Sequence, residues 1–256
     1  MVILLFIAGQ KYIKSVPAFC KCCKFGVMSL IQDVVSLFFP RVCPGCGNLL
    51  YKNEEVLCIR CLANLPKTNF HTIRENAVEE IFWGRIRLQH AVSFLYFAKD
   101  GLTQNIIHNL KYKGNTQLGV LMGTLYGQEL LSSGIFSDLY VIIPVPLHWK
   151  KLKKRGFNQS EVFGKGLSSS LHVPQRTDLL VRKVNTATQT KKSRAERLEN
   201  VSGVFEITDK SFLENKHVLI VDDVITTGAT IEATATTLLE IPGVRVSFAS
   251  IGFASH

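Results

Sequence analysis

The feature that most constrains the fold of this 256-residue chain is the stretch V-L-I-V-D-D-V-I-T-T-G-A-T at residues 218–230. Its unbroken apolar run is typical of a strand buried on both faces of a parallel sheet. Asp222 and Asp223 interrupt that run, and a turn rich in threonine and glycine leads into a helical pattern. Backbone N–H groups at the start of a helix lack partners and favour a phosphate. The order of these features predicts a sugar-phosphate site at the carboxyl end of the strand.

Each residue type in this motif has a chemical use in such a site. Gly228 lets the main chain approach a ligand closely, and the threonine hydroxyls supply further donors. The two carboxylates accept hydrogen bonds from ribose hydroxyls or hold Mg²⁺ through water. The alternative is a buried strand with a capped turn and no ligand, but adjacent acids at such a strand end rarely lack one. The residues expected to bind are Asp222, Asp223, Thr226, Thr227, Gly228, Ala229 and Thr230.

Strand-like and helical patterns alternate along the chain around this motif. The strand-like runs lie at 90–98, 139–145, 178–183, 217–222 and 244–252, and the helical patterns lie at 102–112, 117–132, 157–171 and 228–240. An apolar content of 46% supports a substantial core, and 20% charged residues argues against disorder. The alternation predicts an α/β fold with a mainly parallel sheet and helices on both faces.

Four of the seven cysteines form the pattern Cys43-x2-Cys46-x11-Cys58-x2-Cys61. Two such pairs can surround one Zn²⁺ with four thiolates, which leaves no open coordination position and makes the site structural. Disulfides are a weaker alternative because the chain shows no export signal. A redox pair is weaker still because no thioredoxin-like pattern surrounds either pair. We therefore expect a small zinc-ribbon-like module stabilised by its metal.

The N-terminal segment differs from the rest of the chain. Residues 1–9 are apolar but too short to span a bilayer, and no basic residue precedes them. Met28 begins an amphipathic segment that Pro40 closes, so we expect translation to start at Met28. A membrane-targeting peptide is the alternative. The expected organisation is a non-native extension at 1–27, the amphipathic segment and cysteine module at 28–68, and an α/β domain at 85–256, in a cytoplasmic protein without a membrane partner.

A basic segment follows the second buried strand. That strand, at 139–143, ends in Pro144-Val145-Pro146, because proline cannot continue the pairing. Five cations then occupy six positions: Lys150, Lys151, Lys153, Lys154 and Arg155. A cationic loop beside a phosphate site would clamp a diphosphate leaving group, where charge builds in the transition state. A solvated basic face is the alternative for the lysines, whereas Arg155, fixed beside Gly156, is the stronger ligand candidate. The net charge of +10 fits a polyanionic small molecule, a nucleic acid or a soluble basic protein.

Several stretches together resemble the ComF family (ComFC- and GntX-like proteins). The resemblance is carried by 38–47, 106–115, 144–161, 188–205 and the motif at 218–230. The last of these is similar to the phosphoribosyl-pyrophosphate (PRPP) motif of the type I phosphoribosyltransferases, and R-G-F-N-Q at 155–159 is the most family-specific element. The similarity runs from about Ser29 to the C-terminus. Lys191 and Lys192 depart from the family pattern, and residues 1–27 have no counterpart in it.

The resemblance implies roles for particular residues. The two acids would contact the ribose 2′ and 3′ hydroxyls, and the threonine-rich loop would bind the 5′-phosphate. Val145 and Pro146 would lie in the pyrophosphate loop, and Lys111 and Lys113 would contact substrate, although a favourable helix dipole also explains the two lysines. The polar segment 185–199 would be a mobile cover whose Arg194 and Arg197 close over PRPP. The implied reaction uses PRPP with Mg²⁺ to transfer phosphoribosyl to an unidentified nitrogen acceptor, with release of pyrophosphate.

A second hypothesis is a non-catalytic protein that handles single-stranded DNA or senses nucleotides. The family is associated with natural transformation, and this implies single-stranded DNA and a helicase-like protein as partners. Trp149 and Phe157 flank the basic segment and could stack on bases. A fold retained only for protein interaction is a third option, which the complete PRPP motif disfavours. The isolated histidines are expected to be structural or exposed: His90, His108, His148, His172 and His217.

Overall fold

The computed structural model describes residues 40–183 and 204–254. The chain divides into two compact units, residues 1–41 and 42–256, and every element below belongs to the second. Its helices are α2 Ile59–Ala63, η1 Phe70–Thr72, α3 Ala77–Glu80, α4 Leu102–Tyr112, α5 Thr116–Ser133, α6 Trp149–Arg155, α7 Gln159–Leu171, η2 Ser211–Leu213 and α9 Ala229–Leu239. Its strands are β1 Ala91–Tyr96, β2 Val141–Pro144, β3 Leu180–Arg182, β4 Phe205–Ile207, β5 His217–Ile225 and β6 Arg245–Phe253.

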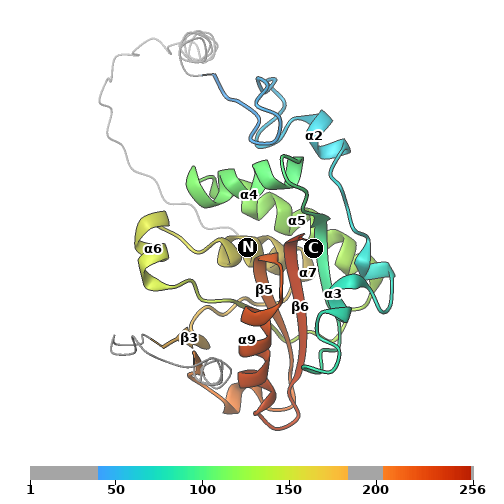
Figure 1. Ribbon diagram of the computed structural model, residues 1–256, viewed down its shortest axis with the longest axis vertical. Coiled ribbons are helices and arrows are strands. Elements are labelled where there is room, and N and C mark those ends of the chain that lie inside the picture. The colour runs from blue at the N-terminus through green and yellow to red at the C-terminus, as the bar shows by residue number, and fades with distance from the viewer. Residues whose placement is uncertain (1–39, 184–203, 255–256) are drawn as a thin grey trace, which may run out of the picture. The chain divides into compact units, whose positions relative to one another are not determined.

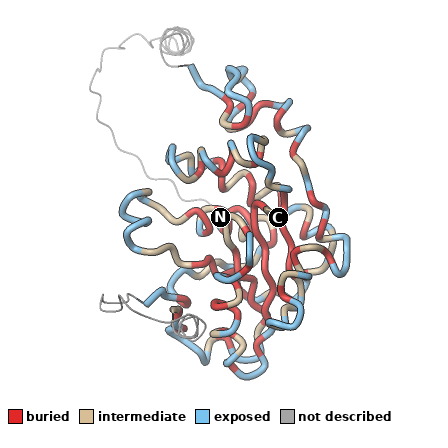
Figure 2. Tube along the Cα trace, viewed as in Figure 1, coloured by how far each residue is buried: buried red, intermediate tan, exposed pale blue. Residues whose placement is uncertain are grey.

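The centre of the domain is a four-stranded parallel sheet in the order β1-β6-β5-β2. The first five residues of β5 are buried, as are all residues of β2, because both faces of these strands are covered. Figure 2 shows the strands as long buried stretches inside a more exposed layer. The expected mainly parallel α/β sheet is therefore confirmed, and β5 lies in its interior as the apolar run at 218–221 indicated.

Helices pack on the sheet on both sides. Figure 1 shows α9 in front of β5 and β6, and α5 and α7 behind them. The α5 and α7 helices touch through Gly123 and Gly166, where a Cβ on either glycine would collide with the backbone of the opposite helix. Glycine inside a helix normally weakens it, but here it allows the two backbones to approach closely. This packing fixes the start of α7 beside the carboxyl ends of β2 and β5.

Three elements differ from the sequence expectation. The strand expected at 178–183 forms as β3, but it pairs antiparallel with β4 in a separate two-stranded sheet. The basic segment is a helix, α6, and not a loop: it consists mainly of lysine, with one leucine and one arginine, and all three residue types favour helices. His148 Nδ1 caps it by accepting the Lys150 N–H. Strand β5 continues through the two acids to Ile225, because β6 supplies pairing partners as far as Phe253.

Some expectations concern parts of the chain outside the described residues. They are the start at Met28, the extension 1–27, the amphipathic segment up to 39, and the cover at 185–199 with Lys191, Lys192, Arg194 and Arg197. Within the described ranges, no helix combines the length and the hydropathy that crossing a membrane requires.

Candidate functional site

The two adjacent acids lie near the carboxyl end of β5 and have different partners. Ser160 Oγ, at the start of α7, donates a hydrogen bond of 2.8 Å to Asp222 Oδ1. Lys111 Nζ, in the last turn of α4, forms an ion pair of 2.9 Å with Asp223 Oδ2. The side chain of Asp223 is 14% exposed and that of Lys111 is 22% exposed, so the pair is largely shielded from solvent. The sheet thus presents one carboxylate to α7 and the other to α4.

The electrostatics of this pair favour a ligand that satisfies the acids. Burial raises the pKa of Asp222 to about 7, and the neighbouring charge of Asp223 adds to the shift. The hydrogen bonds from Ser160 and from the Asp223 N–H, together with the Lys111 charge, oppose it only in part. A carboxyl group with this pKa is partly protonated at neutral pH. Hydroxyl donors from a ligand would favour its ionised form.

The loop expected to bind phosphate, residues 226–230 (the phosphate loop), follows immediately after β5. Gly228 has φ of 74° and forms the N-cap of α9, a conformation that glycine adopts without strain. The glycine is buried, whereas the loop residues on both sides are exposed: Thr226, Thr227, Ala229 and Thr230. Unpaired N–H groups of the first helical turn therefore lie beside accessible hydroxyls, which is an arrangement suited to a phosphate.

The start of α7 connects two parts of the site. Asn158 Nδ2 donates to the carbonyl of Val145 (2.9 Å), and Asn158 Oδ1 caps the helix by accepting the Ser160 N–H. The Val145 N–H donates to Val221 O in the neighbouring strand, so both backbone groups of Val145 already have protein partners. Val145 and the half-buried Pro146 were expected in the pyrophosphate loop, whereas the roles of Asn158 and Ser160 were not predicted. Their only signal was the N-cap pattern that opens the helix.

The cations expected near the site occupy different surroundings. Arg155 is held by Gln159 Oε1 at 2.7 Å and lies over the ring of Tyr112 at 5.5 Å. Lys111 reaches the acids, whereas Lys113 is exposed at the end of α4. The structure therefore brings only Lys111 of these three cations into direct contact with an acid of the motif.

A cavity of about 470 Å³ adjoins Asp223 and Thr226. Its walls include Phe97, Ile107 and Val224, and its polar groups include Lys111. The size is in the range of small-molecule sites, which are mostly apolar with a few polar groups that fix orientation.

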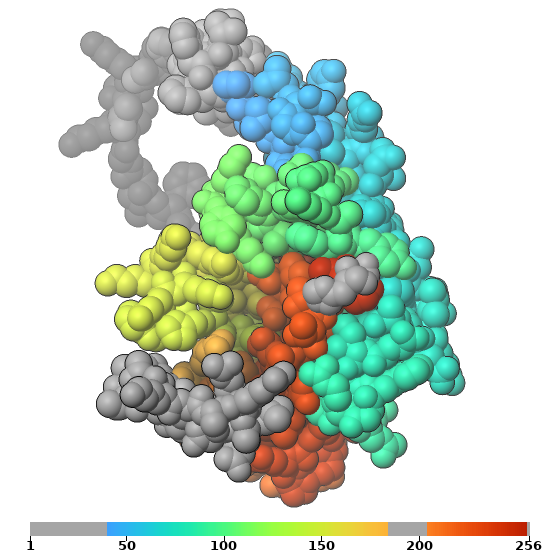
Figure 3. Space-filling model, in the orientation of Figure 1, coloured from blue at the N-terminus to red at the C-terminus, as the bar shows by residue number. Residues whose placement is uncertain are grey.

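The basic helix α6 has no buried residue. Its Trp149 is 49% exposed and Leu152 is 42% exposed, and Lys150 Nζ lies 5.5 Å from the centre of the Trp149 ring. Figure 3 shows the yellow segment that contains α6 projecting from the surface. The helix therefore offers an accessible surface that is both aromatic and cationic.

The four predicted metal ligands come together. The Sγ atoms of Cys43, Cys46, Cys58 and Cys61 all lie within 4.8 Å of one another, and those of Cys46 and Cys58 are 3.7 Å apart. A tetrahedron with Zn–S bonds of about 2.3 Å places its sulfurs roughly 3.8 Å apart, so these residues fit a Zn²⁺ ion. Their arrangement supports a metal site but does not identify the metal by itself.

Surrounding groups shape this cluster. The N–H groups of Cys58 and Cys61 point at Cys43 Sγ and Cys58 Sγ, both at 3.4 Å. Burial raises the pKa of the Cys58 and Cys61 thiols, whereas backbone N–H donors outweigh burial at Cys43 and lower its pKa to about 7. Buried Glu54 accepts from the Tyr51 and Ile59 N–H groups and so braces the second cysteine pair. Metal binding must therefore displace protons from shielded thiols.

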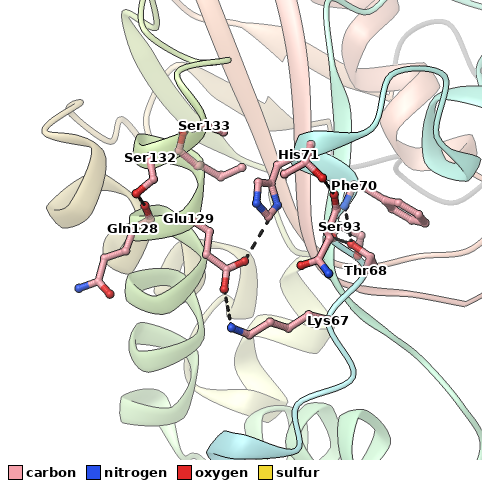
Figure 4. A network of polar contacts seen from close by, with 12 residues as sticks. Lys67, Thr68, Phe70, His71, Ser93, Gln128, Glu129, Ser132 and Ser133 are labelled. Atoms are coloured by element: carbon pink, nitrogen blue, oxygen red, sulfur yellow. Dashed lines mark hydrogen bonds and ion pairs between the residues drawn. The ribbon is translucent and has the colours of Figure 1, made fainter.

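A polar cavity of about 460 Å³ lies between η1 and the second half of α5 (Figure 4). Lys67 Nζ pairs with Glu129 Oε1 at 2.7 Å, and His71 Nδ1 lies 4.0 Å from Glu129 Oε2. Burial lowers the pKa of His71, and Glu129 opposes this shift. Lys67 also bridges to Leu95 of β1, so these contacts hold the segment between the cysteine module and the sheet. This histidine was not singled out by sequence analysis.

Of the histidines expected to be structural or exposed, His217 at the start of β5 is structural. Its Nδ1 contacts Asp138 Oδ1 at 2.7 Å and its Nε2 contacts Ser247 Oγ at 2.8 Å. Burial lowers the pKa of His217, and the Asp138 carboxylate opposes this shift. The residue links β5 to β6 at the sheet end opposite the acids.

Comparison with known proteins shows which proteins this part of the chain is similar to. The phosphoribosyl transferase domain matches residues 158–255, a range that includes α7, both acids and the phosphate loop. Residues 158–255 therefore match a phosphoribosyl transferase domain, in agreement with the expected fold class. Among solved structures, the glutamine PRPP amidotransferase from B. subtilis is similar with a TM-score of 0.36 and 22% identity, over 51% of this chain and 25% of that chain.

Sequence relatives extend the similarity to most of the chain. The DNA utilization protein YhgH of Shigella flexneri is 28% identical over 235 residues, which cover 88% of this chain and 92% of the relative. The competence protein ComFC of Bacillus subtilis is 27% identical over 205 residues, which cover 75% of this chain and 81% of the relative. These matches confirm the resemblance that the motifs indicated.

Proposed function

We propose that this chain binds PRPP with Mg²⁺ and transfers phosphoribosyl to a nitrogen acceptor. The proposal is supported by the match to the phosphoribosyl transferase domain and by the similarity to the YhgH and ComFC proteins over most of the chain. The observation that carries this proposal is the pair Asp222–Asp223 directly before a glycine loop that caps α9. The acids would accept the ribose hydroxyls, and the loop would bind the 5′-phosphate.

The reaction would proceed by displacement at C1 of the ribose. The acceptor nitrogen forms a bond to C1 while the bond from C1 to the diphosphate oxygen breaks, and pyrophosphate leaves with the bonding electron pair. The proton of the acceptor nitrogen passes to solvent. Positioning of the sugar by Asp222, Asp223 and the loop would supply most of the catalysis, and Mg²⁺ brought with PRPP would supply positive charge to offset that of the leaving group. Neither acid acts as a nucleophile.

The cavity beside Asp223 is the proposed acceptor site. Its walls from Phe97, Ile107 and Val224 suit the faces of an aromatic heterocycle, and Lys111 lies at its edge next to Asp223. A sugar held by the acids would direct C1 toward a ring nitrogen in this cavity. The proposed acceptor class is therefore a planar nitrogen heterocycle.

Calorimetric titration with PRPP and Mg²⁺ tests this function first. We expect binding by the native protein and none by the Asp222→Ala/Asp223→Ala variant, with both proteins folded and carrying equal zinc. Pyrophosphate release would then be measured with a panel of nucleobases and other nitrogen heterocycles. Absence of PRPP binding in the native protein contradicts the proposal, whereas binding without release by any acceptor would restrict it to nucleotide sensing.

A second candidate function, handling of single-stranded DNA, is favoured by α6 and by the names of the relatives. Exposed Trp149 beside Lys150 combines a stacking surface with a cation, as in proteins that bind single strands. Binding of an oligothymidine should weaken steeply with salt and be lost in the Lys150→Ala/Lys151→Ala/Lys153→Ala variant. The exposed Lys210→Ala serves as the matched control. Equal binding by both variants would exclude α6 as the contact surface.

A further inference from the structure

The segment that follows α3 packs against the outer side of the phosphate loop. A Cβ on Gly228 would lie 2.8 Å from both Ile81 Cγ2 and Phe82 Cε1, so this segment leaves no room for a side chain there. Phe82 is only 2% exposed and stacks edge-on against Phe248 of β6. The segment is therefore anchored in the core while it touches the loop.

Arg85 ties this segment to the loop and to α9. Its Nη1 donates to the carbonyl oxygens of Thr227 (3.0 Å) and Ile81 (3.1 Å). Its Nη2 forms an ion pair with Glu232, in the first turn of α9. One guanidinium group thus connects three parts of the chain, and its fixed planar geometry suits this task better than a lysine ammonium would.

The contact with the Thr227 carbonyl determines where the next N–H points. The Thr227–Gly228 peptide is planar and trans, so its C=O and its N–H point in opposite directions. Because Arg85 holds the carbonyl on the outer side, the Gly228 N–H is directed to the inner side of the loop, where the phosphate would bind. Glu232 neutralises the guanidinium, so the effect of Arg85 on a phosphate acts mainly through this orientation.

We propose that Arg85 is a positioning residue for the phosphate loop, which presets the Thr227–Gly228 peptide to donate its N–H to the 5′-phosphate. This inference rests on the proposed PRPP binding. It assigns a role in the site to a residue more than a hundred positions before the loop.

The variants Arg85→Met and Arg85→Lys test the proposal in the full-length, zinc-loaded protein. Calorimetry with PRPP·Mg²⁺, ribose 5-phosphate and pyrophosphate separates the two ends of the substrate. We expect both variants to bind PRPP and ribose 5-phosphate about tenfold more weakly, a loss typical of a hydrogen bond to a charged group, and to bind pyrophosphate unchanged. Retention of the charge in Arg85→Lys should not restore binding. Arg87→Met, which removes an exposed cation from the same segment, is the control and should bind like the native protein.

The ligand comparison distinguishes positioning from general destabilisation. Equal loss of ribose 5-phosphate and pyrophosphate binding, or no loss of either, would overturn the role of Arg85. If Arg85→Met does not fold, Arg85→Lys provides the second variant, because it keeps the charge but cannot hold the Thr227 carbonyl and Glu232 with one planar group. A native protein that binds neither PRPP nor ribose 5-phosphate would overturn the proposed function, and this inference with it.

Discussion

The cysteine module (Cys43, Cys46, Cys58 and Cys61) and the strand-end site (Asp222 and Asp223) both bring together groups that repel one another when ionised. The two regions balance this repulsion in different ways. In the module, four sulfurs close around a position for one ion, and Asn105 and Asn109 of α4 hydrogen-bond to the Gly45 and Pro44 carbonyls to hold the first cysteine pair. At the strand end, Asp222 and Asp223 keep an accessible side and are only partly balanced by Ser160 and Lys111.

The difference is the one expected between a site that stabilises the fold and a site that binds a ligand. A closed thiolate cluster gains its free energy when the protein folds around the metal and then has no position left for another ligand. Two adjacent carboxylates without a full set of donors reduce the stability of the ligand-free protein, and a ligand can relieve that cost. Mutation should therefore have opposite effects on the free energy of unfolding in the two regions.

Removal of the metal should have the largest effect. Chelation, or Cys58→Ser, is expected to expose residues 43–63 to hydrogen exchange, because a structural zinc site contributes on the order of 10 kcal/mol to folding of its own module. The interior strands β5 and β6 should remain protected. Exchange measured by mass spectrometry, with zinc content determined in parallel, checks this expectation. Equal loss of protection in the sheet would show that the two regions fold as one unit.

Asp222→Asn should stabilise the protein while it weakens ligand binding. Folding raises the pKa of Asp222 from 3.8 to about 7. The free energy of unfolding of the native protein therefore falls as pH rises through this window. The variant should unfold at the same denaturant concentration as the native protein at pH 4, and should be about 2–4 kcal/mol more stable at pH 8. PRPP affinity should fall at least tenfold. Greater stability of the native protein at pH 8 would mean that the acid is balanced without a ligand.

The main features of both regions could be predicted from the sequence because they depend on local patterns. The strand, the paired acids and the glycine loop are consecutive, and the two cysteine pairs have a spacing that allows one metal, so their positions could be predicted. The amphipathic patterns also located α4, α5, α7 and α9 within a few residues.

The contacts that complete the site come from distant segments and carry no local signal. Arg85 lies far from Thr227 in sequence, and only the packing of Phe82 in the core brings the two together. Ser160 reaches Asp222 because close glycine contacts place α7 against α5 and fix its start. The basic segment was expected to be a loop because its charge suggested exposure, but lysine and leucine also favour a helix and exposure does not exclude one.

Lys111→Met tests how far the ion pair with Asp223 balances the charge of the two acids. Loss of the ammonium group leaves Asp223 without its ion-pair partner and should raise the pKa of Asp222 further. PRPP should therefore bind roughly three- to tenfold more weakly at pH 7, and the deficit should shrink at pH 9, where Asp222 is ionised. Lys113→Met is the matched control, since Lys113 is exposed at the end of the same helix, and calorimetry at the two pH values checks both variants. Tighter binding by Lys111→Met at pH 7 would instead mean that Lys111 competes with the ribose for Asp223.

Tyr126→Phe should have the smallest effect on stability. It measures how much an unsatisfied polar group that binds neither a metal nor a ligand lowers the free energy of unfolding. The Tyr126 hydroxyl is fully buried, and it has no hydrogen-bond partner among the residues that the structure describes. Its ring stacks on Phe94 at 4.8 Å, and phenylalanine would preserve this contact. The variant should be more stable by about 0.5–1 kcal/mol in urea denaturation, because it no longer desolvates a hydroxyl. Tyr140→Phe, at a partly exposed ring, should change stability by less. Destabilisation by Tyr126→Phe would show that the hydroxyl has a hydrogen-bond partner in solution. Of the two, only the charged carboxylates at the strand end would then lower the stability of the protein.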